Sequence, residues 1–191
     1  MILSLFSLIG GMLLFALILY VVLIFNGIIQ LKFNIEKAWA NIDVLLKQRH
    51  EEVPNLAACV QGAASFEQRV MENVTTARAG AEGAGTVGEK AQAEAALSAA
   101  IGHLFAVAEK YPDLKATENF VALQKRLTEL ESEIADRREF YNDSVANYNI
   151  RIQQFPDLMV AKTMKLQPRD MYRVSEEAQQ AIRVQFGVDR N

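Results

Sequence analysis

The sequence predicts an all-α fold: an N-terminal transmembrane helix followed by an antiparallel bundle of about four helices. Three observations support this prediction. Residues 1–31 contain no Asp, Glu, Lys or Arg, so every charged side chain lies from Lys32 onward. Good helix formers dominate the rest of the chain, which contains only four prolines. No apolar–polar alternation of the kind typical of a β-strand extends beyond a few residues.

Residues 2–25 form an almost continuous apolar stretch, interrupted only by Ser4, Ser7 and the pair Gly10–Gly11. A helix needs about 20 such residues to cross the hydrocarbon core of a bilayer. A cleaved signal peptide is the main alternative, but it would carry basic residues before an apolar run of about 7–15 residues. A buried core helix of this length would rarely lack charge. We therefore predict a retained transmembrane anchor over residues 1–31.

The basic residues near the anchor predict its orientation. Lys32, Lys37, Lys47 and Arg49 follow the apolar stretch, and no Lys or Arg precedes it. Basic residues close to a membrane helix favour the cytoplasmic side. The sequence therefore favours a short N-terminus outside and a helical domain in the cytoplasm.

Residues 31–53 are expected to continue the membrane helix into water, because their apolar side chains share one helical stripe. The stripe consists of Phe33, Trp39, Ile42, Leu45, Leu46 and Val53. Trp39 is expected to be a core residue whose loss destabilises the bundle more than that of Tyr141 or Tyr148. Pro54 is expected to end or kink this helix, and the helical pattern then resumes to about Ala79.

Four glycines within residues 80–88 predict a flexible loop. The next predicted helix is alanine-rich and covers residues 89–109, and Tyr111–Pro112–Asp113 breaks it. Thr117 can then serve as the N-cap of the longest helix. Its apolar positions step by three and four as far as Phe155, with an arginine at the gap, and Pro156 ends it.

A helix of about 38 residues would be roughly 57 Å long and needs long partners. The two segments that flank Pro54 together have that length. Residues 157–169 are expected to be a loop, and Met171–Phe186 a short helix or an extended segment. The soluble part is thus a helical bundle domain over residues 32–186, with a short C-terminal extension, and residues 187–191 are a tail.

Charge and cysteine content exclude some classes of function. The chain carries 20 basic and 23 acidic residues, for a net charge of −3, which gives no support for nucleic-acid binding. Cys59 is the only cysteine, so no intramolecular disulfide can form. It lies among small apolar residues without a cationic neighbourhood, which is typical of an inert, buried thiol.

No pattern for catalysis, cofactor binding or metal binding is found. Neither His50 nor His103 has a second His or a Cys at ligand spacing, and each is expected to be solvated or satisfied by a hydrogen bond. The run Glu129–Glu139 lacks the Glu-x-x-His motif of di-metal bundles and is interpreted as a solvated face. We therefore predict no catalytic, cofactor-binding or metal-binding residues, and no enzymatic activity.

Several polar residues stand out in the predicted helices, and most are asparagines, which usually prefer caps and turns. They are Asn34, Asn41, Asp43, Asn55, Asn119, Asn142, Asp143, Asn147 and Asn149. One interpretation places them at caps near Pro54 and at solvent-exposed positions. The other places them in polar contacts within the bundle or between subunits, where they would fix register. Both interpretations remain open from the sequence.

Four blocks of sequence together resemble the LemA family of bacterial membrane proteins. The first block comprises Phe33–Asn34, Ala38–Val44, Leu46–Arg49 and Val53–Leu56. The second comprises Tyr111–Ala116, Asn119–Phe120 and Leu123–Gln124, and the third Arg137–Arg138, Tyr141–Asp143 and Tyr148–Asn149. The fourth comprises Phe155–Pro156 and Pro168–Arg169. Their order and spacing cover roughly residues 31–186.

The resemblance implies a protein of the bacterial inner membrane, with an N-terminal transmembrane helix followed by an antiparallel helical core. It implies no catalytic residues. The long heptad seam, the alanine-rich surface and the absence of a catalytic motif suggest a self-associating scaffold that organises membrane or envelope components. The resemblance suggests the alternative, an adaptor or regulatory subunit of a membrane-bound enzyme, such as an envelope stress protease. The expected partners are the lipid bilayer, further copies of the chain and another membrane protein.

Overall fold

The structure, a computed structural model, describes residues 2–61 and 67–173. Within these ranges the chain is helical and has no β-strand, which confirms the predicted all-α bundle. The helices are α1 (Ile2–Gln61), α2 (Gln68–Gly83), α3 (Val87–Ala108), α4 (Pro112–Lys115), α5 (Glu118–Arg151) and α6 (Asp157–Thr163). The predicted tail and most of the segment Met171–Phe186 lie outside the described residues.

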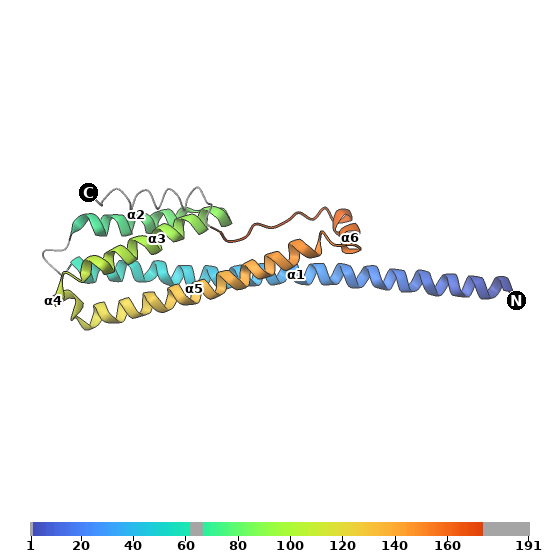
Figure 1. The fold of residues 1–191 in the computed structure, drawn as a ribbon, viewed down its shortest axis with the longest axis horizontal. Helices are drawn as coiled ribbons and strands as arrows, with labels where there is room; N and C mark the ends of the chain where they lie inside the picture. Colours follow the sequence, from blue (N-terminus) through green and yellow to red (C-terminus); the bar gives the residue numbers. More distant parts are fainter. Residues whose placement is uncertain (1, 62–66, 174–191) are drawn as a thin grey trace.

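The two longest helices lie side by side in opposite directions, and α2 and α3 form an antiparallel pair beside them (Figure 1). The N-terminal half of α1 continues alone beyond the other helices (Figure 1). As expected, the residues on both sides of Pro54 supply the long partner of α5.

Helix α1 does not end at Pro54, contrary to one of the two predicted outcomes. It runs for 60 residues and contains this proline in its interior. Val53 and Leu56 beside it are buried in the core. This packing keeps the helix continuous although proline supplies no backbone N–H.

The glycine-rich segment is mostly helical, so the loop predicted over residues 80–88 is wrong in extent. Helix α2 continues to Gly83, with Ala81 buried in the core, and α3 already begins at Val87. A capping box starts α3: Thr86 Oγ1 accepts from Glu89 N–H (3.2 Å), and Glu89 Oε2 accepts from Thr86 N–H (2.9 Å). This cap stabilises the helix start and leaves only residues 84–86 between the helices.

The ends of α5 also differ from the prediction. Thr117 occupies the N-cap position, but its hydroxyl donates to the Leu114 carbonyl (2.7 Å) instead of capping the helix. At the other end α5 stops at Arg151, and Phe155 is 80% exposed. Its apolar seam therefore ends at Ile152, which is buried.

Residues 157–169 are not simply a loop as predicted, because α6 forms within them. Asp157 is buried and pairs with Arg151, and Ala161 packs against the core. These contacts stabilise a helix that the sequence between the two prolines did not predict. Residues 164–173, here called the strap, then run without regular structure along α5.

The buried apolar side chains form two clusters. The proximal cluster joins α1 from Ile24 to Leu46 with the start of α3, α5 from Leu130 onward, α6 and the strap. The distal cluster joins α1 from Val53 to Val60 with α2, α3, α4 and the start of α5. Phe33, expected on the apolar stripe, is 64% exposed, and Ile35 and Ala38 are buried instead.

Helices α1 and α3 are both long and apolar enough to cross a membrane. They differ in burial: the buried share of the most apolar stretch is 39% in α3 and only 6% in α1. The large apolar side chains from Ile2 to Leu23 are 43–87% exposed. Helix α3 therefore serves as a core helix, and the first half of α1 has the surface expected of a membrane anchor.

Candidate functional site

A network of charged side chains crosses the interior of the bundle. Arg49 of α1 is 1% exposed and bonds to three partners on two other helices. It pairs with the fully buried Glu94 of α3, donates to Glu131 of α5 (2.5 Å) and donates to Ser98 (2.8 Å). Ser98 in turn donates to Glu131 (2.9 Å). One guanidinium thus connects α1, α3 and α5.

His50 completes the network on the side of α3. Its Nε2–H donates to Glu94 Oε1 at 2.8 Å. Burial alone would raise the pKa of Glu94, but the hydrogen bond from His50 and the charge of Arg49 outweigh it and hold the pKa below its usual value. Glu94 is therefore ionised at neutral pH, and His50 is a satisfied histidine, one of its two expected states.

The network lies at the junction of the two apolar clusters. Leu46 precedes it on α1 in the proximal cluster, and Val53 follows it in the distal cluster. Because a buried charge is costly unless it is paired, each helix must place its charged residue at one level of the bundle. The network therefore fixes the relative positions of the helices.

The ion network was not predicted from the sequence. Glu131 belongs to the predicted solvated face, whereas in the structure its carboxylate accepts a hydrogen bond from the buried Arg49. A signal was available, because Glu94 falls on the apolar stripe of α3 between Ala91 and Leu97. Arg49 likewise falls on the stripe of α1. A lone acid and a lone base on two apolar stripes indicate a buried ion pair.

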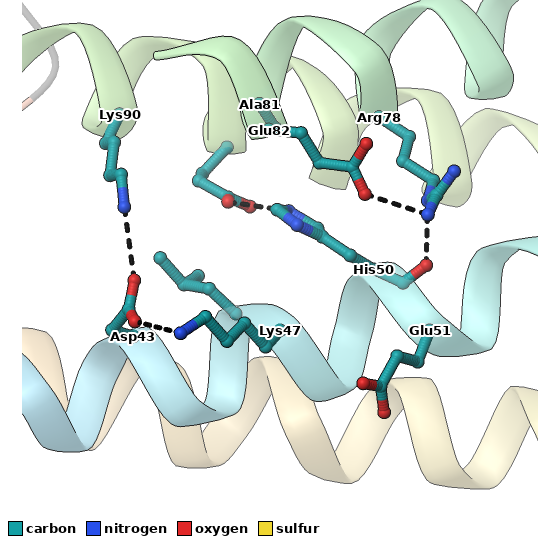
Figure 2. Close-up of a pocket in the computed structure, with 10 residues that line it drawn as sticks. Asp43, Lys47, His50, Glu51, Arg78, Ala81, Glu82 and Lys90 are labelled. Carbon is teal, nitrogen blue, oxygen red and sulfur yellow. Dashed lines mark hydrogen bonds and ion pairs between the residues drawn. The ribbon is translucent and has the colours of Figure 1, made fainter. Parts of the chain in front are cut away.

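An open pocket of about 430 Å³ lies beside the network, among α1, α2 and α3 (Figure 2). It is lined by Asp43, Leu46, Lys47, His50, Glu51, Arg78, Ala81, Glu82, Lys90 and Glu94. Figure 2 shows Asp43 between two lysines, with Lys47 at 2.8 Å and Lys90 at 3.1 Å. Arg78 pairs with Glu82 (2.8 Å) and donates to the His50 carbonyl (2.8 Å).

Polar contacts around this pocket connect α1 to α2 and α3, because Lys90 pairs with Asp43 and Arg78 donates to the His50 carbonyl. Its lining contains no Ser, Thr or Cys nucleophile, and its one histidine is bound to Glu94. Within residues 2–61 and 67–173, no group of three or more His, Cys, Asp or Glu could hold a metal ion. His103 is exposed, and Cys59 is half-buried against the distal cluster.

Two asparagines of α5 bind the strap. Their hydrogen bonds are polar contacts within the bundle, which is one of the two interpretations of the asparagines. Asn142 accepts from the Tyr172 N–H (2.7 Å) and donates to the Tyr172 carbonyl (3.2 Å). Asn149 forms the same pair of bonds with Arg169, at 2.8 and 2.9 Å. Asn34, Asn41, Asn55, Asn119 and Asn147 are exposed, as the other interpretation proposed.

The preceding tyrosines repeat this pattern. Tyr141 donates to the Asp170 carbonyl (3.1 Å) and Tyr148 to the Gln167 carbonyl (3.3 Å). Each Tyr-Asn pair lies seven residues from the other on α5, which is about 10.5 Å of helix. The bound positions lie three residues apart on the strap, which is about 10 Å of extended chain. The repeat therefore matches the period of the helix to that of the strap.

Replacing Asn142 by alanine is expected to loosen the strap at Tyr172. Two hydrogen bonds are lost, each with a net contribution of about 0.5–1.5 kcal/mol, so we expect a loss of about 1–3 kcal/mol. Hydrogen exchange of the Tyr172 amide measures this directly, and the exposed Asn147→Ala is the matched control. Equal protection of this amide in both variants would contradict the clamp.

Comparison with known proteins decides the family. The model of the LemA family matches residues 38–186, which is most of the chain and includes the ion network and the strap. The chain belongs to the LemA family. This confirms the resemblance carried by the four sequence blocks. Membership of the LemA family and the exposed apolar half of α1 together indicate membrane association.

Several relatives are magnetosome proteins. Magnetosome protein MamQ 2 and Magnetosome protein MamQ 1 of Paramagnetospirillum magneticum are each 40% identical over 57 residues, 30% of this LemA-family chain and 21% of each relative. Magnetosome protein MamQ of Magnetospirillum gryphiswaldense is 23% identical over 158 residues, 69% of this chain and 58% of that protein. The chain thus spans between about a fifth and three fifths of these relatives.

Proposed function

We propose that this LemA-family chain is a non-enzymatic, single-pass protein of the bacterial inner membrane. In this proposal it self-associates as a scaffold that organises membrane or envelope components. The observation that carries the proposal is α1, one continuous helix that serves both as the exposed apolar segment and as the central helix of the bundle. Such a helix couples a membrane position rigidly to a protein surface.

One face of α1 supports self-association. Phe33 and Val44 are 64% and 54% exposed, and they lie 11 residues apart, close to three helical turns. The exposed Lys37 and Ala40 lie between them on the same face. Copies anchored in one membrane share their orientation, so this face of one copy can meet the same face of another in parallel. Exposed apolar side chains in such a row favour a protein contact.

Cysteine cross-linking in native membranes tests this contact. Phe33→Cys and Val44→Cys, each with Cys59→Ala, are expected to give covalent homodimers through like positions on α1. Asn147→Cys, exposed on α5 in the same half of the bundle, is the matched control and should give none. Monomers in all three variants would count against the scaffold and favour an adaptor that binds a different membrane protein.

We further propose that the N-terminus lies outside and the bundle in the cytoplasm, since the basic residues follow the apolar segment. Gly85, exposed between α2 and α3, offers a position for labelling. Gly85→Cys with Cys59→Ala should react with a membrane-impermeant maleimide only after the cells are permeabilised. Labelling of intact cells would contradict this orientation and place the bundle outside.

A further inference from the structure

The level of the membrane along α1 can be located from burial. Side chains from Ile2 to Leu23 are exposed, whereas Ile24 and Ile28 are 3% and 1% exposed because other helices cover them. The 22 exposed residues span about 33 Å, close to the thickness of about 30 Å of a hydrocarbon core. If α1 spans the bilayer as proposed, the bundle begins at the headgroup layer.

Helix α6 lies at this level. Ile24 and Ile28 belong to the same cluster as Ile152 and Ala161, which come from the end of α5 and from α6. The guanidinium of Arg151 lies next to Gly27 of α1, 3.8 Å from the point that a Cβ atom would occupy at this glycine. Figure 1 shows α6 beside α1, close to the point where α1 leaves the bundle and continues alone.

This region exposes both apolar and basic side chains. Phe155 and Met159 are 80% and 64% exposed, and they lie four residues apart. Lys162 and Lys165 are exposed, and neither forms an ion pair within the described residues. The only acid in residues 150–167 is Asp157, which is buried against Arg151.

Lys165 lies at the turn that ends α6. Its φ is +54°, and the next residue, Leu166, donates its N–H to the Ala161 carbonyl (3.0 Å), which closes the helix end. Glycine is normally preferred in this conformation, so Lys165→Gly removes the ammonium group without straining the turn.

We propose that Phe155, Met159, Lys162 and Lys165 form a membrane collar that binds the headgroup layer of anionic phospholipids around α1. Aromatic and aliphatic side chains insert at the interface, and each lysine near an anionic surface adds electrostatic attraction. The collar rests on the proposed single-pass anchor. It would fix the tilt and depth of the bundle, which a single helix alone does not set.

Depth-dependent quenching with the full chain tests the collar. A polarity-sensitive fluorophore is attached at Thr163→Cys, with Cys59→Ala, so the four collar residues stay intact. The protein is reconstituted into phosphatidylcholine vesicles that contain phosphatidylglycerol and headgroup nitroxides. Position 163 is expected to be quenched several-fold more than Ala122→Cys, an exposed position at the far end of α5. Lys162→Gln with Lys165→Gly should lower this quenching without lowering the thermal midpoint of unfolding.

A second label separates this inference from the anchor. Met12→Cys lies in the exposed apolar half of α1 and should be quenched by nitroxides on the acyl chains. Quenching at 12 with equal quenching at 163 and 122 would overturn the collar and leave the anchor standing. Absence of quenching at 12 would overturn both. Quenching at 163 that is the same in vesicles of phosphatidylcholine alone would overturn the role of anionic lipid.

Discussion

Replacement of Glu94 by alanine is expected to destabilise the bundle by about 3–5 kcal/mol, because it leaves the guanidinium of Arg49 buried with an incomplete set of partners. Whole domains are commonly stable by only about 5–15 kcal/mol, so this is a large share of the total. Urea unfolding followed by circular dichroism in mild detergent measures the change. A loss below about 0.5 kcal/mol, the usual range of surface substitutions, would refute the structural role of the pair.

Two variants serve as controls for this prediction. Arg49→Met with Glu94→Leu removes both charges and fills the space, so its stability should be close to or above that of the original. Glu131→Ala should cost less than Glu94→Ala, because the Glu131 side chain is 42% exposed and water can replace it. The order of the three values distinguishes a buried network from general disturbance of the core.

Acid should weaken the same network. The pKa of Glu94 is lowered in the fold, mainly because the His50 hydrogen bond and the Arg49 charge outweigh the effect of burial. The stabilisation is therefore fully present above the ordinary pKa of about 4.5 and is lost as the pH falls through the lower folded value. Glu94→Gln should remove this part of the acid dependence.

Tyr148→Ala is expected to cost about 3–5 kcal/mol, the range for a large side chain removed from a packed core. Tyr148 is 2% exposed, and its hydroxyl also bonds to the strap. Trp39→Ala should cost less, about 2–3 kcal/mol, because Trp39 is only partly buried. The centroid of its ring lies 5.5 Å from that of Tyr141 and 6.1 Å from that of Tyr172.

This order reverses the one expected from the sequence, which placed Trp39 first. Residue size and position on a stripe suggested a fully buried tryptophan. In the structure its ring lies at the edge of the proximal cluster, below the cation of Lys90 at 5.5 Å. Unfolding midpoints of the two alanine variants decide between the orders. A larger loss for Trp39→Ala would show that the ring is more important to the core than its burial indicates.

The repeating parts of the fold could be predicted from the sequence. Apolar steps of three and four defined α5, and its length required the long antiparallel partner that α1 provides. The spacing of apolar residues predicts each helix separately and does not reveal the contacts between helices. Helix α6 and the continuous passage of α1 through Pro54 depend on contacts with other helices, which local propensity does not contain.

The polar contacts were harder to predict because their partners are distant in sequence. Glu94 lies 45 residues from Arg49 along the chain. The strap clamp was more accessible, since the Tyr-Asn pairs at 141–142 and 148–149 repeat at helical spacing. That repeat indicates a functional row on α5, but only the structure shows that an extended segment of the same chain occupies it.

The mass of the full chain in mild detergent tests the proposed self-associating membrane scaffold most directly. Light scattering during size-exclusion chromatography, corrected for bound detergent, should give a multiple of the 21.3 kDa protomer. Phe33→Ser with Val44→Ser should lower that mass while the circular dichroism spectrum stays unchanged. A protein mass of one protomer at every concentration would contradict the scaffold.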